Sequence, residues 1–295
     1  MNVGNEGQRR HGARGAPRPD EGFALLTVVW AISLVSLCAT IYMTAAQTRS
    51  KEAAAAAGHA RANAAARAGM MLGISELVSV VLRNPAALSD DEQNGSGRCQ
   101  LGGGDMVRWM ATSESGRVDV NAASEELIHA LMRVTAANDD DWRAASRALL
   151  RAREEMRILA GDDKSPAFRS IADLSRLPDL SHAQYERLRP FVTVHSGRPG
   201  LHPGKASPAL LSRLGDRGSR GATPAYFLAD VPGHVFRIVS EADVGGAVAQ
   251  HRAIVEIDAE APVSFAIREW RDGFEPVDRP FPELVVANCR ALQPQ

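Results

Sequence analysis

Few residues in this sequence have the types and spacing that chemistry requires. The sequence contains no Cys-x-x-Cys, His-Glu-x-x-His or Gly-x-Ser-x-Gly motif, which are the patterns of redox, zinc-protease and serine-hydrolase sites. His195 and Ser196 are the nearest base and nucleophile. Adjacent side chains in an extended segment point to opposite sides, so this pair has poor geometry for a catalytic dyad. We therefore expect a protein that is not an enzyme.

Runs of aspartate are the candidate metal ligands. One run is Asp139, Asp140 and Asp141, and a shorter one follows at residues 162–163. Calcium is held by several oxygen ligands, so it is the ion that such a run could bind. Neither run has the spacing of a calcium-binding loop. Helix caps and exposed turns explain both runs without a metal, so we expect no cofactor and keep calcium at Asp139–Asp141 as the alternative.

An arginine-rich segment, residues 141–159, is the candidate nucleic-acid surface. Arg143, Arg147 and Arg151 share one helical face because they are four residues apart. Glu154, Glu155 and the neighbouring aspartates balance this charge, and the net charge of the whole chain is −1. We expect a solvated helix face with local ion pairs and no binding of nucleic acid.

The chain has three cysteines, two of which could form a disulfide. Cys38 lies in an apolar segment, whereas Cys99 and Cys289 are expected in one exported compartment, where disulfides form. The prediction is a Cys99–Cys289 bond, and two free thiols are the alternative.

The segment 23–48 carries no charge and predicts a transmembrane helix. At 1.5 Å per residue it reaches about 39 Å, enough to cross a hydrocarbon core of roughly 30 Å. The apolar part of a cleavable signal is shorter, about 7–15 residues. Four arginines precede the segment and a large domain follows it, which favours a cytoplasmic N-terminus.

The segment 1–22 is expected to be a leader peptide. It is basic, ends in Gly22 and is followed by Phe23 at the start of the apolar helix. This arrangement resembles the class III signal of type IV pilins and pseudopilins. The resemblance implies that a prepilin peptidase cuts between Gly22 and Phe23 on the cytoplasmic side, leaves the helix attached and allows methylation of the new amine. An ordinary single-pass anchor is the alternative.

The helix is expected to continue beyond the membrane through residues 49–84. The stretch is rich in alanine, the strongest helix former, and Pro85 is its first hard stop. Apolar residues between Met70 and Val81 recur at helical spacing and predict packing on a soluble domain. Gly58, Gly69 and Gly73 would allow close approach of neighbouring elements.

The rest of the chain divides into three parts by its pattern. Residues 85–120 are expected to form a loop, exposed over 86–104, followed by a first strand. Residues 121–225 predict an all-helical domain in which "ASEELIHAL" (123–131) is repeated as "ASPALLSRL" (206–214). Residues 226–295 predict strands, including a hairpin with a tight turn at Gly245-Gly246. These strands need a second layer, which the amphipathic part of the long helix can supply.

Two helical segments resemble the helix-hairpin-helix repeats of exported DNA-binding proteins. They are "VDVNAASEELIHALMRV" and "FRSIADLSRLPDL...LRPFVTV". The positions that correspond to the phosphate-binding hairpins are Met132–Val134 and Pro178–Ser181. At the second, Asp179 replaces a glycine that would let backbone and phosphate approach, and adds a repelling charge. A membrane-anchored, periplasmic, DNA-binding helix-hairpin-helix protein is therefore the alternative function.

Taken together, these motifs resemble the minor pseudopilin K of type II secretion, the general secretion pathway protein K family. The most specific pieces are "GFALLTVVWAISLVSL", "GRVDVNAASEELIHAL" and "DLSRLPDL...RLRPFVTVHSGRPG", in this order. The resemblance implies an α+β fold: a long N-terminal transmembrane helix packs on a small antiparallel pilin-like sheet, into which a large all-helical domain with helix-hairpin-helix-like repeats is inserted. It also implies a single-pass protein of the bacterial inner membrane with a periplasmic C-terminal domain.

The same resemblance suggests a role. Most pilins carry Glu at the fifth mature position, where it pairs with the N-terminal amine of the subunit above. Counted from Phe23, that position is Thr27, whose hydroxyl can bond within its own helix. A subunit without this Glu would sit at the tip of a pseudopilus and start or cap assembly for protein export. The implied partners are other minor pseudopilins, the prepilin peptidase and the inner-membrane secretion platform.

Overall fold

The structure is a computed structural model of the 295-residue chain. It describes residues 20–83, 95–100, 104–136, 139–161, 166–215, 227, 234–258, 265–274, 281 and 287–288. The chain forms two compact units, residues 1–56 and 57–295.

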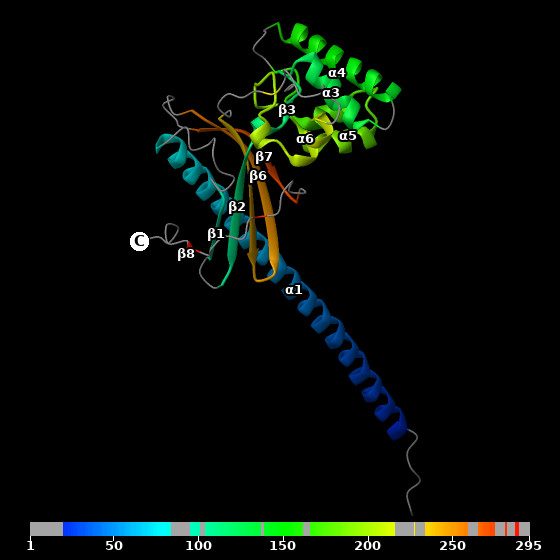
Figure 1. Ribbon diagram of the computed structural model, residues 1–295. Helices are drawn as coiled ribbons and strands as arrows, with labels where there is room; N and C mark the ends of the chain where they lie inside the picture. Colours follow the sequence, from blue (N-terminus) through cyan, green and yellow to red (C-terminus); the bar gives the residue numbers. More distant parts are fainter. Residues whose placement is uncertain are drawn as a thin grey trace, which may run out of the picture. The chain divides into compact units, whose positions relative to one another are not determined.

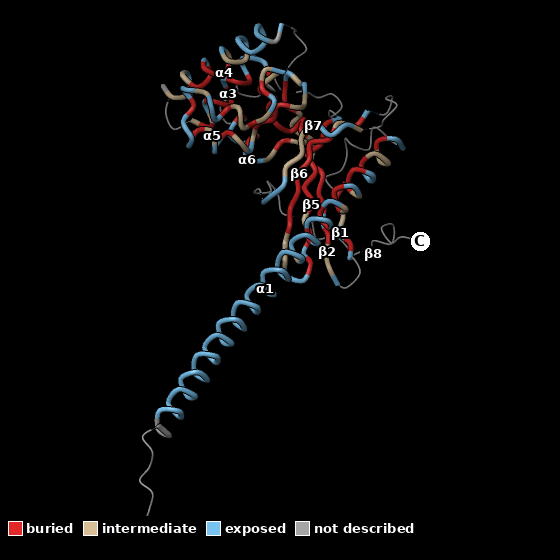
Figure 2. The backbone as a smooth tube through the Cα atoms, turned by 180° about the vertical axis from the view of Figure 1, so that it is seen from behind, coloured by how far each residue is buried: buried red, intermediate tan, exposed pale blue. Residues whose placement is uncertain are grey.

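A single helix, α1 (Asp20–Arg83), runs from the first unit into the second. It confirms the prediction of one unbroken helix and begins three residues before the expected start. Its apolar part has a mean hydropathy of 2.3 over the most apolar window, no residue of which is buried (Figure 2). By length and composition this is a helix that can span a membrane, and it is the one such helix among the described residues.

The second unit contains a six-stranded sheet in the order β7-β6-β5-β2-β1-β8 (Figure 1). Neighbouring strands are antiparallel, except that β8 runs parallel to β1. The strands are β1 (Gly97–Gln100), β2 (Met106–Ser113), β5 (Val235–Val244), β6 (Ala247–Ile257), β7 (Phe265–Asp272) and β8 (Ala287–Asn288).

The β5–β6 hairpin confirms the predicted tight turn. Gly245 and Gly246 join the strands with φ of +58° and +85°. Both angles lie in the left-handed region, which glycine adopts without a steric penalty. The third predicted strand, β7, also forms and pairs with β6.

The prediction of an exposed loop over 86–104 was wrong for residues 97–100. β1 lies in this stretch and pairs with β2, and Cys99 in its centre is only 3% exposed. Gly97 lies so close to the Trp109 ring that an added Cβ would meet the ring at 2.0 Å. Glycine and polar residues give β1 a weak strand signal, so pairing with β2 rather than local propensity forms it.

The part of α1 in the second unit covers one face of the sheet. Its buried residues form two apolar clusters with the strands: one around Met70, Ile74 and Leu77, the other around Ala62 and Ala66. Gly69 and Gly73 lie where the helix approaches the sheet most closely. The expected packing of the amphipathic stripe and the expected role of these two glycines are thus confirmed.

A second group of elements, here called the insert, occupies residues 118–215 (Figure 1). Its helices are α3 (Glu125–Thr135), α4 (Asp139–Ala160), α5 (His182–Leu188) and α6 (Pro208–Gly215). Short 3-10 helices are η2 (Ile171–Arg176), η3 (Arg189–Phe191) and η4 (Pro203–Lys205), and η1 (Glu114–Gly116) precedes the insert. β3 (Val118–Asp119) and β4 (Val192–Thr193) form a small parallel pair.

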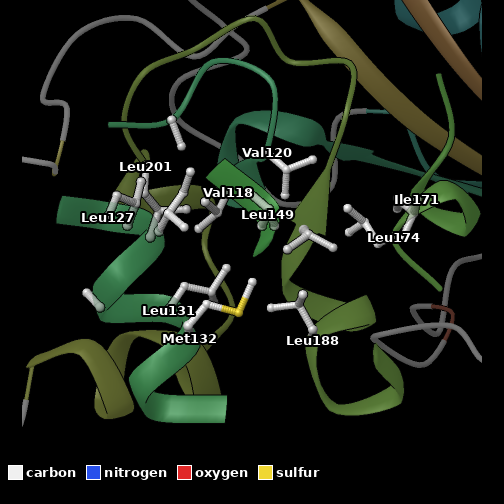
Figure 3. Close-up of a cluster of buried hydrophobic side chains, with 14 of the residues drawn as sticks. Val118, Val120, Leu127, Leu131, Met132, Leu149, Ile171, Leu174, Leu188 and Leu201 are labelled. Atoms are coloured by element: carbon white, nitrogen blue, oxygen red, sulfur yellow. The ribbon is translucent and has the colours of Figure 1, made fainter. Parts of the chain in front are cut away.

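The insert has its own apolar core (Figure 3). Val118 and Val120 belong to this core, so the insert begins near residue 118, slightly earlier than the expected 121. Its expected end at residue 225 lies outside the described residues.

The predicted duplication is visible in the insert. α3 and α6 each begin after a serine whose hydroxyl accepts a backbone N–H: Ser124 from Leu127 and Ser207 from Leu210. The shared leucines of the two copies, Leu127 and Leu131 in α3 and Leu210 and Leu214 in α6, are all buried in one core.

Replacing Gly69 should separate the helix from the sheet. An alanine Cβ there would lie 2.3 Å from Val107 Cγ1 and 2.5 Å from Ser240 Oγ. Overpacking costs about 1–3 kcal/mol, while Gly→Ala inside a helix gains about 1 kcal/mol. We expect Gly69→Ala to lower the free energy of unfolding by up to about 2 kcal/mol, measured by denaturant titration of the detergent-solubilised protein.

Gly58→Ala is the matched control for this substitution. Its Cβ would make ordinary contact with Ala247 at 3.5 Å, so only the helix-propensity gain of about 1 kcal/mol remains. Equal stabilisation by both substitutions would contradict the close approach at Gly69.

The predicted Cys99–Cys289 disulfide can be tested directly. Cys99 is disulfide-bonded, whereas Cys38 is free. Cys289 lies outside the described residues, but β8, which ends one residue before it, pairs with β1 at Cys99 and Gln100. We expect non-reducing peptide mapping to recover a Cys99–Cys289 cross-link. Cys99→Ser should lower stability by about 2–5 kcal/mol, and Cys38→Ser should leave it unchanged; a mapped bond to Cys38 would refute the pairing.

Candidate assembly site

Five side-chain hydroxyl groups in the apolar part of α1 bond within the helix itself. Thr27 Oγ1 donates a hydrogen bond to the carbonyl of Ala24 at 2.9 Å. Four further hydroxyl groups along the helix donate in the same way to carbonyls three or four residues earlier. They belong to Ser33, Thr40, Thr44 and Thr48. In hydrocarbon an unpaired hydroxyl is costly, so these five bonds lower the free-energy cost of placing this helix in a membrane.

The predicted processing site lies at the start of this helix. The backbone of Gly22 and Phe23 is helical, and the Phe23 side chain is 70% exposed. Residues 1–19 of the expected leader lie outside the described residues. Cleavage after Gly22 is not tested by the structure and remains a prediction.

The second hairpin motif forms a turn that suits packing better than phosphate binding. Pro178 and Asp179 are exposed between η2 and α5, whereas Leu180 is buried in the core of the insert. Ser181 caps α5 through a reciprocal pair of hydrogen bonds with Gln184. The exposed Asp179 carboxylate would repel a phosphate at the point where the backbone would have to approach it.

The first hairpin motif was placed wrongly. Met132, Arg133 and Val134 lie within the last turns of α3, and Met132 is 3% exposed in the core. α3 continues to Thr135, because Met132 and Val134 pack against the core and extend the helix. A helical segment has no free backbone N–H groups to offer a phosphate there.

The arginine face of α4 lies in solvent as expected. Arg143, Arg147 and Arg151 are exposed, and Arg157 pairs with Glu154 at 2.6 Å. Arg153 behaves differently: it donates to the carbonyl of Ala123 at 2.7 Å and ties α4 to the start of α3. Burial lowers the pKa of Arg153, and the charges of Glu125 and Glu154 offset part of this effect.

The candidate calcium ligands occupy the first turn of α4. The backbone of Asp139, Asp140 and Asp141 is helical, and the side chains of Asp139 and Asp140 lie outside the description. Among the described residues there is no group of three His, Cys, Asp or Glu side chains that could hold a metal. Calcium binding stays an untested alternative.

His195 and Ser196 bond to different carboxylates and do not face each other. Ser196 Oγ donates to Asp119 at 3.2 Å, and His195 Nε2 lies 2.9 Å from Glu269. Asp119 also accepts backbone N–H groups from Asn121 and Gly197. Burial raises the pKa of the Asp119 carboxyl, and these donors offset part of the rise. The pair therefore joins structural elements and has no dyad geometry.

Two ionic clusters, which sequence reasoning missed, lie near the junction of the insert and the sheet. In one, Glu114 at the end of β2 is fully buried and pairs with Arg117 at 3.1 Å and Arg237 of β5 at 2.8 Å. In the other, Glu269 of β7 meets His195, Arg252 and Arg271. Most of these partners are far apart in sequence, so spacing gave no signal for either cluster.

Glu269 stays ionised in this environment. Burial alone would raise its pKa, but the hydrogen bond with His195 and the charges of Arg271 and Arg252 outweigh it and lower the pKa to about 2. Relative to an ordinary Glu, the ionised form contributes stability that is present above pH 4.5 and is lost as the pH falls towards 2.

Comparison with known proteins supports the fold. No family model and no curated protein matches the sequence. Among solved structures, the chain is similar to one chain of the GspK-GspI-GspJ complex of the type 2 secretion system of enterotoxigenic Escherichia coli. The TM-score is 0.54 at 13% sequence identity, and the match covers 78% of this chain and all of the other. The long apolar helix on an antiparallel sheet is therefore a pilin-like fold of the kind found in that complex.

Proposed function

We propose that this protein is a minor pseudopilin of a type II secretion system. The observation that carries the proposal is the combination of a pilin-like fold with a membrane-length apolar helix at its start. A chain of similar fold belongs to the GspK-GspI-GspJ complex. The proposed role is structural: the protein takes part in a filament assembly for protein export and catalyses no reaction itself.

Thr27 supports a position at the tip of the pseudopilus. A carboxylate at this point of the helix would need a positive partner in the membrane, such as the amine of a subunit above. Thr27 instead satisfies its hydroxyl on its own Ala24 carbonyl. A subunit at the tip has no subunit above it, so it needs no such carboxylate, while its own amine remains able to receive the next subunit below.

The insert supports the same position for a steric reason. It adds a separate core to the pilin-like part, and this volume would be difficult to enclose within a regular filament shaft. The proposed partners are other minor pseudopilins at the tip, with the prepilin peptidase and the inner-membrane platform acting during assembly. The proposed location is the bacterial inner membrane, with the N-terminus cytoplasmic and the C-terminal domain periplasmic.

The mature N-terminus tests the class of protein. We expect intact mass and terminal-peptide analysis of protein from native membranes to show a start at Phe23 with a methylated amine. Gly22→Val, which removes the small residue at the expected cleavage site, should leave the full-length chain. A wild-type chain that still starts at Met1, or that is cut near Ala46, would overturn the proposal.

Substitutions at Thr27 test the position in the filament. Thr27→Ala should leave secretion and recovery of partner pseudopilins by pull-down unchanged, since the lost hydrogen bond is internal to the helix. Thr27→Glu should reduce both, because an unpaired carboxylate in hydrocarbon costs up to roughly 3 kcal/mol. If the Glu variant works as well as the Ala variant, a neighbouring amine pairs with it and the tip position is wrong.

A further inference from the structure

We propose that the insert is a module with its own apolar core and that the Glu269 carboxylate of β7 holds it against the sheet. When this contact is lost, the insert can move away from the sheet without unfolding of either part. This inference concerns the mechanics of the chain and does not depend on the proposed function.

The apolar cores of the two parts are distinct. The core of the insert contains buried side chains between Val118 and Leu214 (Figure 3). The clusters under α1 contain residues of α1 and of the sheet strands only. Within the described residues, no buried apolar side chain belongs to both sets, so the insert and the α1–sheet part each have an apolar core of their own.

The side-chain contacts that are described across the junction are polar instead. His195, just after β4, places Nε2 2.9 Å from Glu269 Oε2. Ser170, the cap of η2, bonds through Oγ to the guanidinium of Arg271. Interfaces of this polar kind within one chain behave like transient interfaces, so relative motion is the physical expectation.

Glu269 is the centre of these contacts. Its Oε1 faces Arg252 Nη2 at 3.2 Å and the Nε of Arg271, while Oε2 faces His195. The carboxylate is 14% exposed as a side chain, and its lowered pKa keeps it charged. Neutralising it would remove the negative charge that attracts His195 and Arg271, the arginine that holds Ser170.

The cluster around Glu114 lies where a hinge for this movement is expected. Glu114 follows directly on β2, at the point where the chain leaves the sheet for the insert. It holds Arg117 and Arg237, and Gly116 packs against the backbone of Lys205 so closely that an added Cβ would meet the Lys205 carbonyl oxygen at 2.0 Å. These contacts lie beside the covalent connection, whereas the contact of Glu269 with His195 joins the sheet to the insert away from that connection.

The test measures the distance between the two parts in the full-length protein in detergent. Spin labels are placed at Arg147→Cys on α4 and Ser75→Cys on α1, both exposed, in a Cys38→Ser background. We expect one narrow distance distribution for this reference protein. Glu269→Gln, and separately His195→Gln, should give a broader distribution, with amide-exchange protection of Leu127 and Ile238 unchanged.

Glu256→Gln is the matched control. Glu256 also pairs with an arginine, Arg268 of β7, but the pair is exposed and involves sheet residues only. The spin-label distance distribution of the Glu256→Gln variant should equal that of the reference protein. If the distance distribution is unchanged in both Glu269→Gln and His195→Gln, Glu269 does not hold the insert and the proposal is wrong. The proposal is also wrong if both cores lose amide-exchange protection together.

Discussion

The close packing of α1 on the sheet is the constraint on which the rest of the structure depends. One helix has to be apolar on all sides in its first part and amphipathic in its second part. In the second part the helix can pack closely on the sheet because small residues line the contact. These residues are Ala62, Ala66, Gly69 and Gly73. The larger side chains from Met70 to Val81 then fill the space over β2, β5 and β6. The sheet is stable only with this second layer, since its strands need an apolar face to be covered.

The second constraint is electrostatic and acts where the insert meets the sheet. Buried charges are tolerated only when they are paired and hydrogen-bonded, and both ionic clusters meet this condition with two arginines around one glutamate. Truncating one partner of such a group costs far more than the pair contributes to net stability. The Glu269 cluster therefore holds the insert through His195, and the Glu114 cluster holds the segment that leads into the insert, whereas each part has an apolar core of its own.

Prediction from the sequence succeeded where the signal is local and periodic. The unbroken helix and the turn at Gly245-Gly246 each depend on residues close together in the chain. It failed at β1, whose four residues form a strand only because β2 is beside them. It failed also at Met132–Val134, where packing against the core extends α3 through the expected hairpin.

The sequence by itself determined the class of architecture: a membrane-length helix that continues as an amphipathic one, strands with a tight turn, and a duplicated helical block between them. These follow from composition and period, which act over a few residues. Only the tertiary structure decided that Glu269 meets His195 and that Glu114 meets Arg237. The physical reason is that the ionic contacts join residues separated by most of a domain, and no periodicity in the chain records which distant charges will be buried together.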